Sequence, residues 1–286
     1  MDRSSKSFIT RILVKIRIWH LFLISLAYLF ICAITIILVD VYDVAGIRTY
    51  MIEAEFYFQR IWVYIFHEAG PTEMLQWMFL GALALISAFV AGKLTEQNDT
   101  RIGVFWFLIS IVAFILFLED SANISHEFYE YTGIFVPHTS ILYSRVPVYV
   151  VYMIIALVPL VKYWKDIRSY SRTLRYLIGG YLLYGAVSIQ SAFLGNFGID
   201  RTVVGDFLLY NVFKGVLSFP FPHQDVSDLF MDTVIEESLE LIAATVLFAA
   251  IIAFISEKES KEKSPSVNGR DVAEKNSTDS GKTFAE

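Results

Sequence analysis

The sequence contains a single cysteine, Cys32, which lies inside an apolar run. One cysteine excludes an internal disulfide, a CxxC metal knuckle and a c-type haem attachment site. Charged residues are also scarce: they make up 18% of the 286 residues, whereas soluble domains carry roughly a quarter. Hydrophobic residues account for 56% of the chain. This composition predicts an integral membrane protein, with the lipid bilayer as its surroundings and no nucleic-acid partner.

Several catalytic motifs are missing as well. Ferritin-like bundles bind pairs of metal ions with Glu-x-x-His on two helices, and no Glu-x-x-His occurs here. Paired histidine boxes, His-Glu-x-x-His, Gly-x-Ser-x-Gly and a glycine-rich phosphate loop are also absent. The missing Glu-x-x-His argues against a standard di-iron oxidase.

Six apolar segments are long enough to cross a bilayer. We expect one all-α transmembrane domain over residues 1–256 and a disordered cytoplasmic tail over residues 257–286, where charges of both signs mix with Ser, Gly and Asn. Three polar residues interrupt the apolar segment 203–219, which is therefore expected to be interfacial or re-entrant. The six predicted spans are 19–39, 73–92, 102–118 with a helical extension to 131, 146–161, 174–194 and 229–255.

The distribution of basic residues predicts the direction of these spans. Of the 23 Lys and Arg residues, 18 fall before Trp19, in 93–101, in 162–175 or after Ile255. Cytoplasmic loops are enriched in Lys and Arg, so we expect a multi-pass protein of the cell membrane with both termini in the cytoplasm. The outer side then holds 18 of the 29 acidic residues and four of the five histidines.

The first outer loop shows a helical repeat of apolar residues between Ile47 and Ile65. Arg48, Glu53 and Arg60 fall off the apolar face. This pattern predicts an amphipathic helix that lies at the level of the lipid headgroups.

The last predicted span begins with a row of carboxylates. At 100° per residue these side chains fall within about 120° of one helical face. The uninterrupted apolar part, 241–255, is about 22 Å long, which is less than a hydrocarbon core of about 30 Å. The preceding turn is therefore expected within the outer part of the membrane, facing the bundle interior. The row comprises Asp225, Asp228, Asp232, Glu236 and Glu240, with Glu237 beside it.

The helical extension of the third span carries a second polar face, made by Glu119, Asn123, His126 and Glu130. In the predicted topology both faces lie on the outer side, so we expect them to form one site. Carboxylates with imidazole suit a divalent ion such as Fe, Mn or Zn. The predicted metal ligands are Glu119, Asp120, His126, Glu127, Glu236, Glu237 and Glu240. Glu73, near a helix start, is explained by capping alone.

Two resemblances bear on these motifs. The Glu-x-x-Glu sequences at Glu127–Glu130 and Glu237–Glu240 resemble locally the Arg-Glu-x-x-Glu element of iron permeases, with His126 and Glu236 in place of the arginine. The start of a span at Glu68–Glu73, the pair Glu119-Asp120 and the later Glu-Glu-x-x-Glu are similar to motifs of uncharacterised bacterial multi-pass membrane proteins. This resemblance implies no particular activity.

Three functions fit the predicted site. The first is a metal-dependent membrane enzyme that acts on a lipid or lipid-linked substrate, with one carboxylate as general base. The second is an accessory or scaffold protein whose acidic network is structural. The third is a cation or proton-coupled transporter. No catalytic residue is assigned from the sequence.

Overall fold

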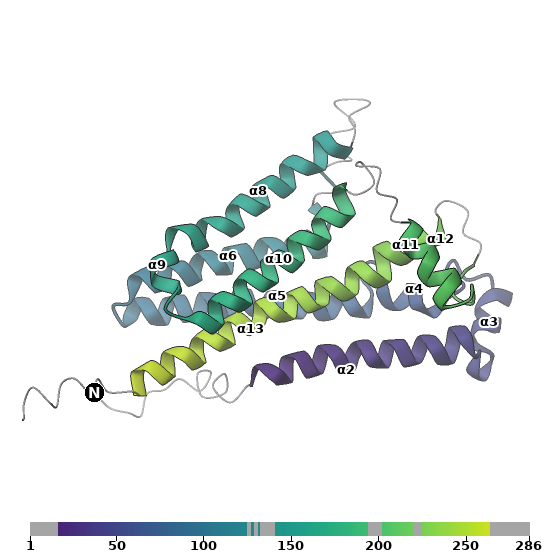
Figure 1. Ribbon diagram of the computed structural model, residues 1–286, viewed down its shortest axis with the longest axis horizontal. Helices are drawn as coiled ribbons and strands as arrows, with labels where there is room; N and C mark the ends of the chain where they lie inside the picture. The colour runs from purple at the N-terminus through teal and green to yellow at the C-terminus, as the bar shows by residue number, and fades with distance from the viewer. Residues whose placement is uncertain are drawn as a thin grey trace, which may run out of the picture.

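The computed structural model describes residues 17–124, 127–128, 131, 141–193, 202–219 and 225–263. The described residues form helices and turns and no strand, as predicted for an all-α chain. Within these ranges six long helices are present, and they lie roughly along one direction (Figure 1). They are α2 (Ile18–Ile36), α5 (Pro71–Glu96), α6 (Thr100–Ala122), α8 (Ile141–Lys162), α10 (Ser171–Phe193) and α13 (Glu236–Lys263).

Shorter helical segments gather at one end of this bundle, except α9 (Trp164–Ile167), which lies at the other end. A second hydrophobic cluster, separate from the main core, joins several of them and includes Trp62, Leu209, Leu217 and Phe230. We call these segments the end cap. They are η2 (Ile37–Val41), η3 (Val44–Gly46), α3 (Ile47–Glu53), α4 (Ile61–Phe66), α11 (Thr202–Asp206), η5 (Phe207–Val212), α12 (Val226–Phe230) and η6 (Met231–Ile235).

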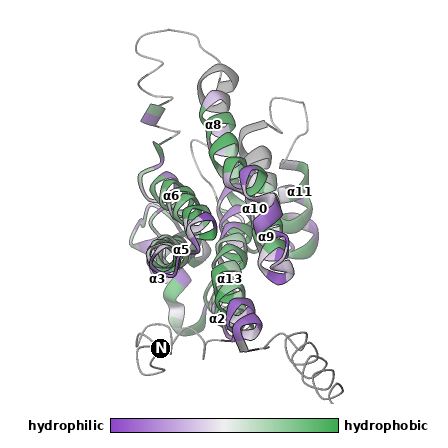
Figure 2. Ribbon diagram, turned by 90° about the vertical axis from the view of Figure 1, so that its left-hand side faces the viewer, coloured by the Kyte–Doolittle hydropathy of each residue, from purple (hydrophilic) through white to green (hydrophobic). Residues whose placement is uncertain are grey.

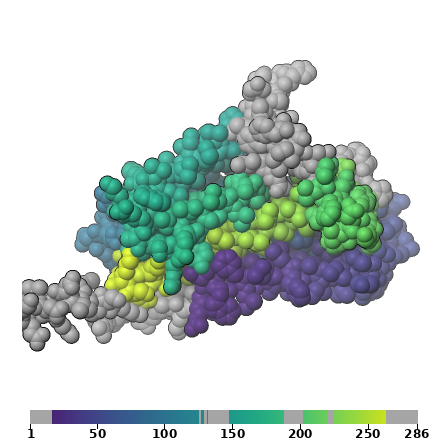
Figure 3. Space-filling model, viewed as in Figure 1, coloured from purple at the N-terminus to yellow at the C-terminus, as the bar shows by residue number. Residues whose placement is uncertain are grey.

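Helix α13 is the centre of the bundle and packs against α10, α5 and α2. It lies between α2 and α10 in Figure 1, and Figure 3 shows its surface between theirs. Small residues let the helices approach closely: a Cβ on Gly180 of α10 would stand 2.5 Å from Leu247 Cδ2. Helix α2 is joined to α13 by a buried hydrogen bond between Ser25 and Thr245, 2.7 Å between their oxygens.

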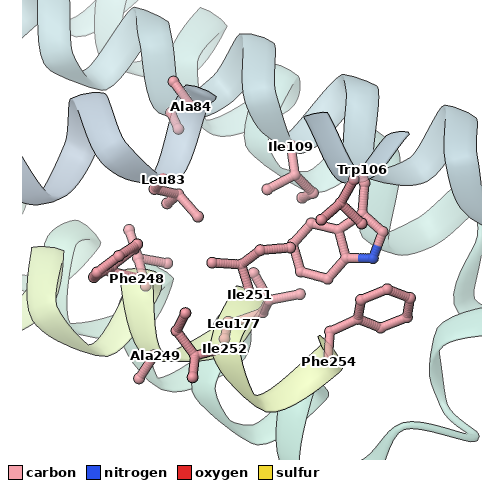
Figure 4. Close-up of a cluster of buried hydrophobic side chains, with 14 of the residues drawn as sticks. Leu83, Ala84, Trp106, Ile109, Leu177, Phe248, Ala249, Ile251, Ile252 and Phe254 are labelled. Atoms are coloured by element: carbon pink, nitrogen blue, oxygen red, sulfur yellow. The ribbon is translucent and has the colours of Figure 1, made fainter. Parts of the chain in front are cut away.

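The main core fills the space between α5, α6, α10 and α13. Figure 4 shows Leu83 of α5, Trp106 of α6, Leu177 of α10 and Ile251 of α13 converging there. Each of these four side chains is at most 2% exposed. The four helices therefore hold one another at fixed depths, which also fixes the heights of the polar residues they carry.

The lengths and hydropathy of the helices fit a membrane-embedded protein. Figure 2 shows mostly hydrophobic helix shafts, with hydrophilic residues near α9. Within the described residues, Pro147–Lys162 is a shorter apolar helix and Thr202–Val212 another. Four helical stretches are long and apolar enough to cross a bilayer: Ile18–Val41, Ile61–Glu96, Thr100–Ala122 and Val226–Glu262.

Three of the segments predicted to be cytoplasmic meet at the end of the bundle away from the end cap. Lys258 of α13 forms an ion pair with Asp99, 2.9 Å, and Arg101 of α6 forms one with Asp166, 3.1 Å. The carboxylate of Glu257 accepts hydrogen bonds from the amides of Arg172 and Thr173 and so caps α10. The loops at 97–100 and 163–170 and the end of α13 thus lie together.

Two helix boundaries differ from the prediction. The extension of the third span to residue 131 is wrong as a continuous helix, because α6 ends at Ala122 and Asn123 adopts a left-handed conformation with φ 46°. Asparagine tolerates this conformation at a helix C-terminus. Helix α13 continues to Lys263, seven residues into the segment predicted as a tail; residues 264–286 lie outside the described residues.

The predicted amphipathic helix of the first outer loop is two short helices, α3 and α4, with a break between them. Tyr50 of α3 is 61% exposed, whereas Trp62 of α4 is fully buried. The indole nitrogen of Trp62 donates to the carbonyl of Leu217, 3.1 Å, so the segment 202–219 covers the aromatic face that we expected at the membrane interface.

Candidate functional site

The start of α5 brings a carboxylate and an amide into the interior of the bundle. Pro71 occupies the first helical position and the backbone amide of Ala69 donates to the carboxylate of Glu73. Glu73 thus accepts from the residue before the N-cap Gly70, whereas the predicted capping would use the amide of Gly70, which donates to the carbonyl of His67 instead. One turn later lies Gln76, which has no exposed surface at all.

The amide nitrogen of Gln76 connects four helices. Nε2 lies 2.5 Å from Oδ2 of Asp120 on α6, 2.9 Å from Oη of Tyr184 on α10 and 3.1 Å from Oε2 of Glu240 on α13. The Tyr184 hydroxyl in turn donates to Asp120 Oδ2, 2.6 Å. Carboxylates that are far apart in the sequence therefore meet around one nitrogen atom. We call these four residues the amide network.

Two buried oxygen atoms at the amide network accept no hydrogen bond from the part of the chain that the structure describes. They are Oε1 of Gln76 and Oε2 of Glu237. Glu237 lies where Glu240, Glu73, Asp120 and Glu236 all act on it electrostatically. Buried oxygen atoms of this kind are rarely left without a donor, since each costs about 1–3 kcal/mol. Among the described residues nothing donates to these two oxygens, and a cation or a proton would compensate for the missing donor.

Further carboxylates lie at the edge of this region. The Tyr152 hydroxyl of α8 donates to Glu119 Oε2, 2.8 Å, and the amide of Asn123 donates to Glu68 Oε1, 2.7 Å. Each pair joins two segments through one hydrogen bond. Glu68 is exposed, so that pair lies at the surface of the cluster.

The structure brings together only part of the predicted ligand set. Asp120 and Glu240 meet at Gln76, and Glu237 and the partly buried Glu236 lie next to them. Glu127 is exposed beyond the break at Asn123, and His126 lies outside the described residues. Among the described His, Cys, Asp and Glu residues, no group of three or more has the spacing to hold a metal ion.

The acidic row of the last span is not on one regular helical face. Met231–Ile235 is π-helical, with i→i+5 hydrogen bonds, so it changes the rotation between the residues before and after it. Asp225 lies at the N-cap of α12, where its side chain accepts from the amide of Ser227, 2.8 Å. Only the carboxylates after the π-helical turn are described at the amide network.

Sequence reasoning missed Gln76, Tyr184 and Tyr152. Gln76 lies near the start of an apolar run and follows Glu73 by three residues, which places the two on one helical face. That spacing was the available signal. The tyrosines carried none, because tyrosine is common in spans and at membrane interfaces.

The chain matches no protein-family model, and comparisons with curated proteins and with solved structures found no match.

Proposed function

We propose that the protein crosses the membrane six times with both termini in the cytoplasm, and that residues around the amide network bind a divalent cation in the outer half of the bilayer. The observation that carries the second part is a pair of buried oxygens, Gln76 Oε1 and Glu237 Oε2, to which none of the described residues donates. Both lie among carboxylates inside a bundle of apolar helices.

The ion pairs between helix ends support the topology. The loops at 97–100 and 163–170 and the end of α13 share one end of the bundle and carry several of the basic residues that favour the cytoplasm. The amide network lies towards the opposite ends of α5, α6 and α13. With the basic end inside, it lies in the outer half of the membrane.

Cysteine labelling tests the topology. In a chain with Cys32→Ser, a cysteine in place of the exposed Glu53 of α3 should react in intact cells with a membrane-impermeant maleimide. A cysteine in place of the exposed Gln97 should react only after permeabilisation. Labelling of both in intact cells, or the reverse pattern, would contradict the proposed orientation.

The oxygen atoms at the amide network favour a hard divalent cation. Within the described residues, the oxygens that meet at the amide network come from carboxylates and a phenol, and oxygen ligands of this kind suit Mg²⁺, Ca²⁺ or Mn²⁺. A bound ion would compensate for the hydrogen-bond donors that are missing at Gln76 Oε1 and Glu237 Oε2. Carboxylates that face one another at this depth also cost several kcal/mol without a compensating charge.

Titration of the detergent-purified protein with Mn²⁺, followed by electron paramagnetic resonance, tests the binding. We expect about one bound ion per chain in the wild type and at least a tenfold larger Kd in Glu237→Gln, because a charged ligand worth more than about 1.4 kcal/mol is lost. Glu262→Gln, on the same helix with a 60% exposed side chain, is the matched control and should bind as the wild type does.

A structural network is the second candidate. The Asp120–Tyr184–Gln76 hydrogen bonds favour it, since these groups partly satisfy one another and join three helices. If neither the wild type nor either variant binds Mn²⁺, the cation proposal is wrong and this candidate takes its place. Two other functions stay predictions: a metal-dependent enzyme that acts on a lipid substrate, and a transporter. Both depend on cation binding, which must be established first.

A further inference from the structure

The nitrogen of Gln76 occupies a position that has more acceptors than it can serve. Three oxygens, from α6, α10 and α13, lie within 3.1 Å of Nε2. A carboxamide nitrogen carries two hydrogens, so it cannot give each oxygen a full hydrogen bond. The orientation of the amide follows from its neighbours, because Oε1 in this place would face the oxygens of Asp120 and Glu240.

The oxygens around Gln76 Nε2 are arranged as the ligands of a metal ion would be. Two carboxylate oxygens and a phenol oxygen from three different helices converge on one point, and the side chain that fills it has no exposed surface. Calcium takes oxygen ligands at about 2.3–2.6 Å, slightly closer than an amide nitrogen stands from its acceptors. Small inward shifts of these side chains would close the shell around an ion.

We propose that the Gln76 amide is a placeholder for the cation: it fills the ion position in the empty site and turns away when the ion enters. This inference rests on the proposed function and adds the residue that regulates it. Rotation about the last torsion of a glutamine side chain meets little resistance, but alone it would put Oε1 where Nε2 stands, so the side chain clears the ion position by rotation at its inner torsions as well. Among the described residues Oε1 has no partner, so its movement breaks no hydrogen bond.

The placeholder explains how the empty site stays folded. Nε2 lies within hydrogen-bond distance of both Asp120 and Glu240, and without it only the Tyr184 hydroxyl would be described as a donor to Asp120. An ion must displace these hydrogen bonds, and bonds to charged groups contribute about 1.5–3 kcal/mol each. Gln76 therefore weakens cation binding in exchange for an empty state that keeps its geometry.

Mn²⁺ titration of Gln76→Ala tests this role. Removal of the competing amide should lower the Kd about tenfold relative to the wild type, the loss of roughly one hydrogen bond to a charged group. Ser87→Ala is the matched control, since Ser87 is a fully buried polar residue on the same helix whose hydroxyl has no partner. It should leave the Kd unchanged.

A second variant keeps the test decisive if Gln76→Ala folds poorly. In Gln76→Lys a tethered ammonium should reach the same three oxygens and act as a permanent cation, so Mn²⁺ binding should be lost. Retained binding in Gln76→Lys, or an unchanged or larger Kd in Gln76→Ala beside a wild type that binds, overturns the placeholder alone. Absence of binding in the wild type and in Gln76→Ala overturns the proposed function with it.

Discussion

Replacement of Asp40 by alanine is expected to lower the free energy of unfolding by about 3 kcal/mol, since two buried amides lose their acceptor. Asp40 is fully buried, and its two carboxylate oxygens accept from the backbone amides of Ile61, 2.9 Å, and Trp62, 3.0 Å. These are the first amides of α4, which have no partner within the helix. A helix of six residues does not persist without such contacts.

The effect should be visible in the end cap before the main core. Trp62 carries one of the two capped amides and packs against Phe219 and Phe230, so loss of the cap should release the segment 202–219 as well. Hydrogen exchange of the amides in α4 would report this opening, and unfolding in detergent would report the loss of stability.

Asp43→Ala is the matched control for this prediction. Asp43 also accepts from an amide near a helix start, that of Thr49, but its side chain is 18% exposed and not fully buried. The Thr49 hydroxyl, which donates to the carboxylate, lowers the pKa of Asp43 below its ordinary value. Its removal should cost much less stability than that of Asp40. Equal effects of the two substitutions would show that burial of the Asp40 cap is not what matters.

The meeting of Asp120 and Glu240 follows from rules that the sequence displays. Both residues lie where an apolar run ends on the expected outer side, so depth alone places them at one height. The position of Glu73 in the first turn of α5 could be predicted in the same way from the preceding Gly-Pro. Position along a helix axis is set by hydropathy, which a single sequence carries.

The rotation of each helix about its own axis, which decides which side chains face one another, is harder to predict from hydropathy. The π-helical turn at Met231–Ile235 and the left-handed Asn123 both change which side chains share a face, and neither has a unique sequence signature. The burial of Trp62 depends on contact with Leu217, 155 residues away in the chain. Gln76 was missed because a neutral amide looks like an interruption of an apolar run until its acceptors are seen.

Glu237→Gln is expected to raise the free energy of unfolding by about 2 kcal/mol in the absence of divalent ions. In the folded chain Glu237 must either bury a charge beside Glu240, Glu73 and Asp120 or take up a proton that the unfolded chain does not need. Both alternatives cost stability. A neutral glutamine has neither cost. Its amide nitrogen, in the place of Oε2, can donate a hydrogen bond to a neighbouring carboxylate, whereas Oε2 itself has no partner among the described residues.

The thermal midpoint in detergent with EDTA measures this gain, with Glu262→Gln as the control that should not change it. Added Mn²⁺ should then stabilise the wild type more than Glu237→Gln, because a ligand that binds only the folded state raises its stability. The variant would be the more stable protein without the ion and would gain less when the ion is present. Opposite effects on stability without the ion and on stabilisation by the ion are expected of a site in which binding residues lower the stability of the fold. If Glu237→Gln instead lowers the midpoint in EDTA, the carboxylate is an essential acceptor of the fold, and the excess of negative charge is not the property on which the site depends.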